Sequence, residues 1–130
     1  MLTTGYDPNW DIDLRFGKEG EQFVLDLLSI DAETVEIKRK RYLDFRFYVE
    51  THQLPDRATE YQPSGIQTTK ADYWAYVIGE TGVVVFVPTE HLKRAARNAP
   101  KKRGGERGDN PTRGRLVGEC HLFDNNTGEA

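Results

Sequence analysis

The residues of this chain that could do chemistry are concentrated in positions 34–52, which read TVEIKRKRYLDFRFYVETH. Side chains of a β-strand alternate between its two faces, so Glu36, Lys38 and Lys40 share one face, opposite the apolar side chains. We therefore predict a strand over residues 34–40 whose polar face carries a carboxylate two positions before a lysine.

A second strand with the same alternation follows. Its apolar face is formed by Phe45, Phe47 and Val49. The opposite face carries Asp44, Arg46, Tyr48, Glu50 and His52. The segment between the strands, 42–44, is short enough to join neighbouring antiparallel strands. We expect the two strands to pair with their polar faces aligned, which would place Lys38 between Glu36 and Glu50.

Two carboxylates and a lysine on one surface suit metal-dependent chemistry on a phosphate. Carboxylate oxygens are the ligands that Mg²⁺ prefers, and a neighbouring ammonium can steady a phosphate or an attacking water. Glu36 and Glu50 are thus the predicted ligands of Mg²⁺ or Mn²⁺, and Lys38 is the predicted residue that orients water and offsets developing charge. The alternative is an ordinary antiparallel sheet with a charged, solvated face.

An amphipathic helix is predicted to precede these strands, over residues 16–30. Its apolar positions recur at helical spacing and are Phe16, Phe23, Val24, Leu27 and Leu28. Glu21 lies at the margin of this stripe, where a carboxylate needs a partner such as Lys38 or a metal ion. Two explanations remain open: Glu21 is a further catalytic and metal-binding acid, or it is a favourable acidic residue near the helix amino terminus.

These features resemble the PD-(D/E)xK nuclease superfamily, whose restriction-endonuclease-like core has a helical glutamate followed by strands that carry an acid and then an acid-x-lysine motif. The resemblance covers about residues 16–87. The positions that carry it are Gly20-Glu21, Glu36-Ile37-Lys38, Glu50, Ser64-Gly65-Ile66 and Thr68-Thr69-Lys70-Ala71-Asp72-Tyr73-Trp74. The amino-acid sequence of the second half of this region is similar to that of small phage or bacterial nuclease-like proteins.

One departure from the superfamily pattern leaves two assignments of the motif open. The superfamily usually carries its lysine on the later strand, where this chain reads Glu50-Thr51-His52. In the first assignment the lysine has migrated, so that Glu36 and Glu50 are the two strand acids and Lys38 reaches their pocket from the neighbouring strand. In the second, Glu36-x-Lys38 is the whole motif and Glu50 is peripheral.

The charge of the chain is unevenly distributed. The net charge is −3, yet residues 93–115 carry nine Lys or Arg residues against Glu106 and Asp109. Local potential governs the binding of polyanions, so we predict a basic phosphate-binding loop over residues 98–113. The predicted nucleic-acid contacts are Lys40, Gln62, Ser64, Lys101, Lys102, Arg103, Arg107 and Arg113.

Length and composition predict one domain over residues 1–130, with an acidic amino-terminal arm at 1–14 and a polar tail at 124–130. The chain has no apolar run long enough for a membrane span and no secretory signal, so we expect a cytoplasmic protein, by its resemblance phage-encoded. The single cysteine, Cys120, is expected to be a buried strand residue.

The predicted fold is α/β, with a mixed central β-sheet flanked by helices in the order αββ(β)αββαβ. Its later elements are a short helix up to Trp74, strands at 74–78 and 83–87 joined by a turn, and a helix that begins at Pro88-Thr89-Glu90. A closing strand is expected between Leu116 and Phe123.

The predicted function is metal-dependent hydrolysis of phosphodiester bonds, with DNA as the favoured nucleic acid. The alternative is a noncatalytic nucleic-acid-binding or assembly protein that keeps a nuclease-like fold. A homo-oligomer is compatible with the amino-terminal arm, where Trp10 could contact a second subunit.

Overall fold

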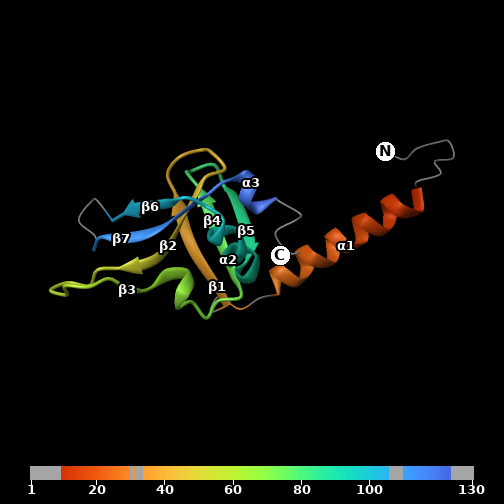
Figure 1. The fold of residues 1–130 in the computed structure, drawn as a ribbon. Coiled ribbons are helices and arrows are strands. Elements are labelled where there is room, and N and C mark those ends of the chain that lie inside the picture. The colour runs from red at the N-terminus through yellow and green to blue at the C-terminus, as the bar shows by residue number, and fades with distance from the viewer. Residues whose placement is uncertain (1–9, 30, 32–33, 106–109, 124–130) are drawn as a thin grey trace. The chain divides into compact units, whose positions relative to one another are not determined.

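The computed structural model describes residues 10–29, 31, 34–105 and 110–123, and it divides into two compact units, residues 1–32 and 33–130. The first unit contains helix α1, Trp10–Leu28 (Figure 1). This helix begins six residues before its predicted start, so residues 10–14 of the predicted arm are helical. The rest of the arm lies outside the described residues. The prediction of a single domain over residues 1–130 stays a prediction.

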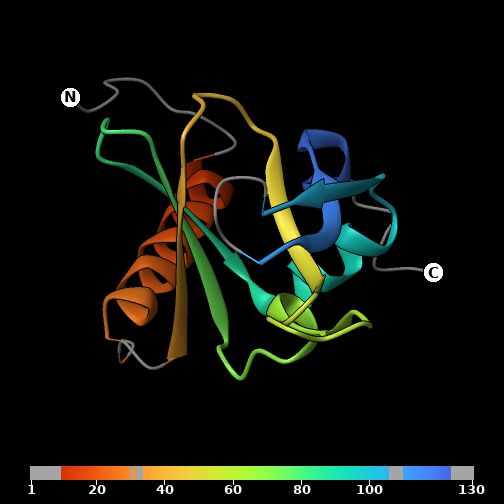
Figure 2. The same ribbon diagram turned by 90° about the vertical axis from the view of Figure 1, so that its left-hand side faces the viewer.

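The second unit is built from two β-sheets and short helices (Figures 1 and 2). The three-stranded sheet has the order β1-β4-β5, with β1 Val35–Lys40, β4 Tyr73–Ile78 and β5 Val83–Pro88. The four-stranded sheet has the order β3-β2-β7-β6, with β3 Gln62–Pro63, β2 Phe47–Gln53, β7 Thr112–Val117 and β6 Lys101–Gly104. The helices are η2 Gly65–Gln67, a 3₁₀ helix, α2 Thr89–Arg97 and α3 Glu119–Leu122. The α/β class is confirmed.

The predicted pairing of the first two strands is wrong, because β1 and β2 belong to different sheets. β1 pairs in parallel with β4, and β2 pairs antiparallel with β3 and β7. Figures 1 and 2 show the two strands diverging from the loop that joins them. That loop is held by Asp44, which accepts a hydrogen bond from the ammonium of Lys40 and another from the Arg46 backbone N–H at 3.1 Å. Asp44 therefore connects the end of β1 with the residue that precedes β2.

The polar face of β1 is only partly exposed to solvent. Glu36, Lys38 and Lys40 are half-buried, whereas Ile37 is 63% exposed. The Lys38 Nζ lies 5.5 Å from the centroid of the Trp74 ring, and the Lys40 Nζ lies 5.8 Å from that of Phe47. Aliphatic lysine stems and cation–π contacts of this kind let charged residues line an aromatic surface. The aromatic surface therefore stabilises the half-buried position of the two lysines.

The core of the second unit lies among β2, β4, β7 and α2. Its largest fully buried side chains are Phe47, Val49, Trp74, Leu92 and Val117. β4 has the central position of its sheet, and four of its six residues are buried. The antiparallel pair β4 and β5 and the helix that begins at Thr89 are confirmed. The short helix up to Trp74 is wrong, since η2 ends at Gln67 and β4 begins at Tyr73.

Part of the predicted basic loop, 98–113, lies in two paired strands. β6 and β7 pair over Lys101–Gly104, and residues 106–109, with Arg107 among them, lie outside the described residues. Two glycines make the hairpin possible, because the Tyr48 ring lies across both strands. A Cβ at Gly114 would lie 2.9 Å from that ring, and one at Gly104 would lie 2.8 Å from it. The Tyr48 hydroxyl hydrogen-bonds Thr112 Oγ1 at 2.6 Å, which fixes the ring there.

The carboxy-terminal part of the described chain differs from its prediction. Cys120 is exposed on α3, so its prediction as a buried strand residue is wrong; the closing strand ends at Val117, before Gly118. No helix among the described residues is long and apolar enough to span a membrane. The predicted tail, 124–130, lies outside the described residues.

Candidate active site

The strands of both sheets contribute to one cleft of about 510 Å³ in the second unit. Lys38 comes from β1, and Tyr48 and Glu50 come from β2. The aromatic side chains of β4 and Lys102 of β6 line the same cleft. The structure thus brings Lys38 and Glu50 to one cleft although their strands do not pair.

Glu50 is held by the segment that follows β3. The Ser64 hydroxyl donates a hydrogen bond of 2.7 Å to Glu50 Oε2, and Ser64 is only 6% exposed. Gly65 has a φ of +57°, and a Cβ on it would lie 2.3 Å from the Glu50 carbonyl oxygen. Only glycine permits both the left-handed conformation and this close approach. This buried hydroxyl positions a carboxylate, and the phosphate contact at Ser64 stays a prediction.

Replacing Ser64 by alanine should loosen the Glu50 carboxylate without removing it. We expect a loss of about 1 kcal/mol of stability, because a hydrogen bond to a charged group is lost while half-buried Glu50 can recruit water. Thermal unfolding of Ser64→Ala measures this cost. In a Glu50→Ala background the same substitution should cost measurably less, since the acceptor is absent. Equal costs in both backgrounds would show that Ser64 does not act through Glu50.

Lys38 and Glu36 form the neighbouring part of the site. The Lys38 Nζ lies 3.7 Å from Glu36 Oε2, and both side chains are about two-fifths exposed. An ion pair with this exposure stabilises the fold by little. Glu36 lies beside Trp74 in the parallel register of β1 and β4. Both groups therefore remain free to exchange this contact for a ligand.

Two tyrosines that line the cleft are shielded from water: Tyr76 is buried and Tyr48 is half-buried. Burial raises the pKa of Tyr76 far above its usual range, and the charge of Glu36 raises it further. Burial also raises the pKa of Tyr48, with a smaller contribution from the Glu50 charge, against the opposing effect of the Thr112 hydrogen bond. Electrostatic interactions inside such a cleft are stronger than they would be in bulk water.

Lys40, predicted as a nucleic-acid contact, is engaged within the protein. Its side chain is 9% exposed and its ammonium is paired with Asp44. That hydrogen bond is the main reason why the pKa of Asp44 lies below its usual value. The ammonium of Lys40 is therefore already engaged by a carboxylate, and its contact with nucleic acid stays a prediction.

The donor set for a metal ion is small. Within the part of the chain that the structure describes, no group of three or more His, Cys, Asp or Glu residues could hold a metal ion. Glu21 is an exposed residue of α1 in the first unit, and its role as a third acid stays a prediction. Mg²⁺ usually keeps several waters and takes only one or two carboxylates from the protein. Glu36 does not line the cleft that contains Glu50, so the binding of one ion by both carboxylates stays a prediction. Ser64 leaves Oε1 of Glu50 without a hydrogen bond from that residue.

A β-bulge in β2 changes which residues share the face of Glu50. Glu50 lies opposite Gly114, but after an irregularity at Thr51 the next residue, His52, lies opposite Arg113. Successive residues of β7 point to opposite faces, so His52 lies on the other face from Glu50. Its predicted place beside Glu50 is wrong. The alternation of residues in the sequence carries no signal of the extra residue.

The predicted basic contacts are divided between the two faces of the four-stranded sheet. Lys102 pairs with Gly114, so it lies in the row of Glu50 on the cleft face. The other face carries Lys101 opposite Arg115 and Arg103 opposite Arg113. Arg113 also lies 3.8 Å from the centroid of the Tyr61 ring. Gln62, on β3, is exposed beside Gln53.

Comparison with known proteins adds no assignment: neither the protein-family models, nor the curated proteins, nor the solved structures contain a match to this chain. The fold and the cleft define the second unit as a mixed α/β unit with a lysine and carboxylates at the junction of two sheets.

Proposed function

We propose that this protein is a metal-dependent nuclease that hydrolyses phosphodiester bonds of nucleic acid, with DNA as the favoured substrate. The observation that supports the proposal most strongly is the presence of Lys38 and Glu50, from two different sheets, in one cleft of about 510 Å³. A lysine and carboxylates gathered by tertiary structure, with Ser64 holding one of them, are more than the solvated face of a single sheet requires.

The roles follow from the chemistry of each group. Glu36 and Glu50 would hold Mg²⁺ or Mn²⁺, which when bound supplies Lewis-acid stabilisation of the phosphate and an activated water. The Lys38 ammonium would orient water and offset the negative charge that develops on the phosphate. Glu21 remains a proposed assisting acid.

Membership of the PD-(D/E)xK superfamily, with its restriction-endonuclease-like core, is part of the proposal. The parallel pair of β1 and β4 and the shared cleft of Lys38 and Glu50 support it. The same cleft favours the assignment in which the lysine has migrated to the earlier strand, because Glu50 lines the cleft together with Lys38 and is not peripheral.

Cleavage assays test the proposed function directly. Plasmid and single-stranded DNA would be incubated with the full chain in the presence of Mg²⁺, Mn²⁺ or EDTA. We expect cleavage that requires the metal and stops in EDTA. Binding without any metal-dependent cleavage would contradict the nuclease proposal.

A noncatalytic nucleic-acid-binding protein is the second candidate. It is favoured by one observation, the like-charged cross-strand pairs Lys101–Arg115 and Arg103–Arg113 on the face opposite Glu50. Like charges directly opposite each other destabilise a sheet by about 0.2–1 kcal/mol per pair, so a bound polyanion would relieve a cost that is built into the hairpin.

The hairpin therefore provides an informative double variant, Lys101→Ala/Arg103→Ala. We expect its thermal stability to stay the same or rise, because two like-charge contacts disappear. Its affinity for nucleic acid should fall. The slope of log K against log salt should become shallower by about the contribution of two phosphate contacts. Fluorescence anisotropy in a salt series measures both quantities.

Lys102→Ala is a comparison for that variant: Lys102 lies between the two residues and in the row of Glu50, and its side chain borders both clefts. It should lower cleavage more than it lowers overall binding. An unchanged salt slope for the double variant would identify Lys101 and Arg103 as ordinary solvated residues.

A further inference from the structure

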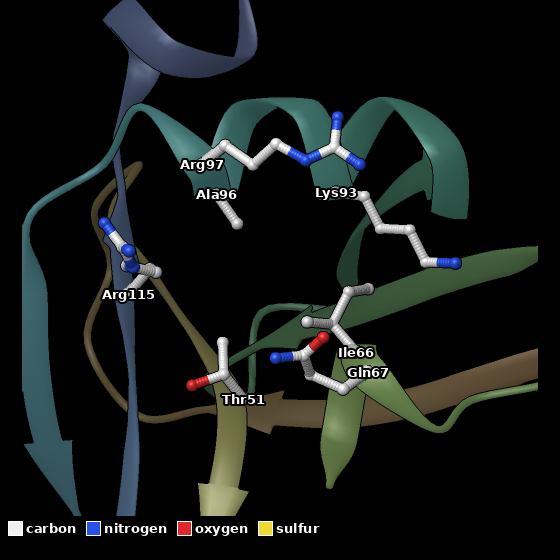
Figure 3. A pocket seen from close by; sticks show the side chains of 7 residues that line it. All are labelled: Thr51, Ile66, Gln67, Lys93, Ala96, Arg97 and Arg115. Carbon is white, nitrogen blue, oxygen red and sulfur yellow. The ribbon is translucent and has the colours of Figure 1, made fainter. Parts of the chain in front are cut away.

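A second pocket, of about 290 Å³, lies between α2, η2 and the four-stranded sheet. Figure 3 shows α2 bordering one side of it, with Thr51 and Gln67 on the opposite side and Arg115 on β7 at one end. Arg115 pairs with Val49 in the register of the sheet, whereas Glu50 pairs with Gly114. The pocket therefore opens on the face of the sheet opposite Glu50.

Arg115 is a charged residue of this pocket without a counterion among the described residues. It is half-buried, and its strand partner Val49 is completely buried. Its guanidinium donates one hydrogen bond of 2.7 Å, from Nη1 to the Ala99 carbonyl oxygen. No carboxylate among the described residues lies within ion-pair distance of it. A guanidinium has five N–H donors, and a half-buried one without a counterion favours an anion.

Two further cations border the same pocket. Lys93 is half-buried, and its only ion-pair partner among the described residues is Glu90, at 3.4 Å, whose side chain is 78% exposed. Arg97 is exposed in the last turn of α2, where the helix dipole alone would favour a positive charge. The helix dipole does not account for Lys93 or Arg115, which lie elsewhere. The pocket thus gathers three cations, of which Arg115 has no ion-pair partner among the described residues and Lys93 has only an exposed one.

The remaining lining suits one compact anion. Ile66 and Ala96 are each 5% exposed and form an apolar floor. The exposed Gln67 amide can add a neutral N–H donor at the rim. Planar guanidinium groups and a lysine ammonium are the groups that proteins use to bind phosphate.

The pocket continues into the basic face of the hairpin. A neighbouring cleft of about 550 Å³ shares Thr51 and Arg115 with it and extends along Lys101, Arg103 and Arg113. Basic side chains therefore follow one another from α2 across β7 to the edge strand β6. A strand of nucleic acid bound along this face would carry a series of phosphates past the pocket.

We propose that the pocket formed by Lys93, Arg97 and Arg115 binds a single phosphate group, presented by a nucleic-acid strand that lies on the face of the sheet opposite Glu50. This site goes beyond the proposed nuclease function, because it requires neither a metal ion nor the cleft. It gives the protein a second contact with nucleic acid, separated from the candidate active site by the thickness of the sheet.

The test uses the full chain in EDTA, so that no cleavage takes place. The pocket variant is Lys93→Gln/Arg97→Gln. Its control, Arg57→Gln/Arg94→Gln, removes the same charge from exposed residues that do not line the pocket. One probe is a fluorescent single-stranded oligonucleotide, titrated by anisotropy in a salt series. The other is inorganic phosphate, whose effect on the melting temperature is compared with that of sodium chloride at equal ionic strength.

We expect the pocket variant to bind the oligonucleotide about tenfold or more weakly, with a flatter salt slope, while the control keeps nearly the wild-type affinity. Inorganic phosphate should raise the melting temperature of the wild type and the control more than that of the pocket variant. A selective loss of the phosphate response alone would support the pocket but identify free phosphate as its ligand. Equal behaviour of pocket variant and control with both probes would overturn the proposal.

Failure of this proposal is distinguishable from failure of the nuclease proposal. The binding measurements contain no divalent cation and can be repeated with Glu50→Gln, whose substituted side chain lies on the other face. Selective binding without cleavage in the metal assay would leave the phosphate pocket in place and remove only the proposed catalysis.

Discussion

Glu50→Gln is expected to lower metal-dependent cleavage by on the order of 10³-fold or more. The amide is nearly isosteric with the carboxylate but is a poor ligand for a hard cation. Loss of a group that stabilises transition-state charge costs factors of about 10² to 10³, and loss of the ion itself would add to that. Single-turnover cleavage of a labelled DNA in Mg²⁺ measures the effect.

Folding should survive this substitution. The Gln side-chain oxygen can still accept the hydrogen bond that Ser64 donates to Glu50 Oε2 at 2.7 Å. Glu60→Gln is a suitable control, since Glu60 is exposed and does not line the cleft. Both variants should show melting temperatures near that of the wild type. Undiminished turnover by Glu50→Gln would remove Glu50 from the site and leave Glu36-x-Lys38 as the whole motif.

Lys38→Met has the second-largest expected effect, a loss of about 10²-fold or more in cleavage with metal binding retained. Methionine keeps much of the aliphatic stem that lies against Trp74, but it removes the ammonium that lies 5.5 Å from the centroid of that ring. If the ammonium serves the water or the developing phosphate charge, the rate falls while the carboxylates still bind the ion. Cleavage rates and Mn²⁺ titrations separate these two effects.

The stability of Lys38→Met should change by no more than about 1 kcal/mol, because the Lys38–Glu36 pair is well exposed and contributes little. Lys70→Met, at an exposed position outside the cleft, is its control. Cleavage by Lys38→Met at the control rate would show that Lys38 is an ordinary strand residue. A parallel loss of metal affinity would show instead that Lys38 positions the carboxylates.

Several elements could be predicted from the sequence because their signals are local. Alternation of polar and apolar residues predicted β1 and β2, and helical spacing predicted α1, although its start was misplaced. The turn between two apolar runs predicted the β4–β5 pair, and Thr89 marked the beginning of α2. The residues around the cleft, Lys38 and Glu50, were named from the same alternation. Their joint participation in catalysis stays a prediction.

The partners of the strands could not be read from the sequence. The short link between β1 and β2 predicted an antiparallel pair. In the structure β1 pairs with β4 and β2 pairs with β7, and both partners lie far along the chain. Pairing is decided by which apolar faces bury one another, and Trp74 and Val117 are distant in sequence from both strands. The Lys40–Asp44 contact is likewise visible only in three dimensions.

The sequence by itself determined the α/β class, the residue types available for chemistry and their order along each strand. The tertiary structure alone decided which of these residues meet. One extra residue at Thr51 moved His52 away from the face of Glu50, and the hairpin register separated Lys102 from Lys101 and Arg103. Ser64 became a support for Glu50 because Gly65 let the chain approach β2 closely. The alternation of residues in the sequence predicts on which face of its own strand a side chain lies. Bulges, register and long-range packing determine which residues that face contacts.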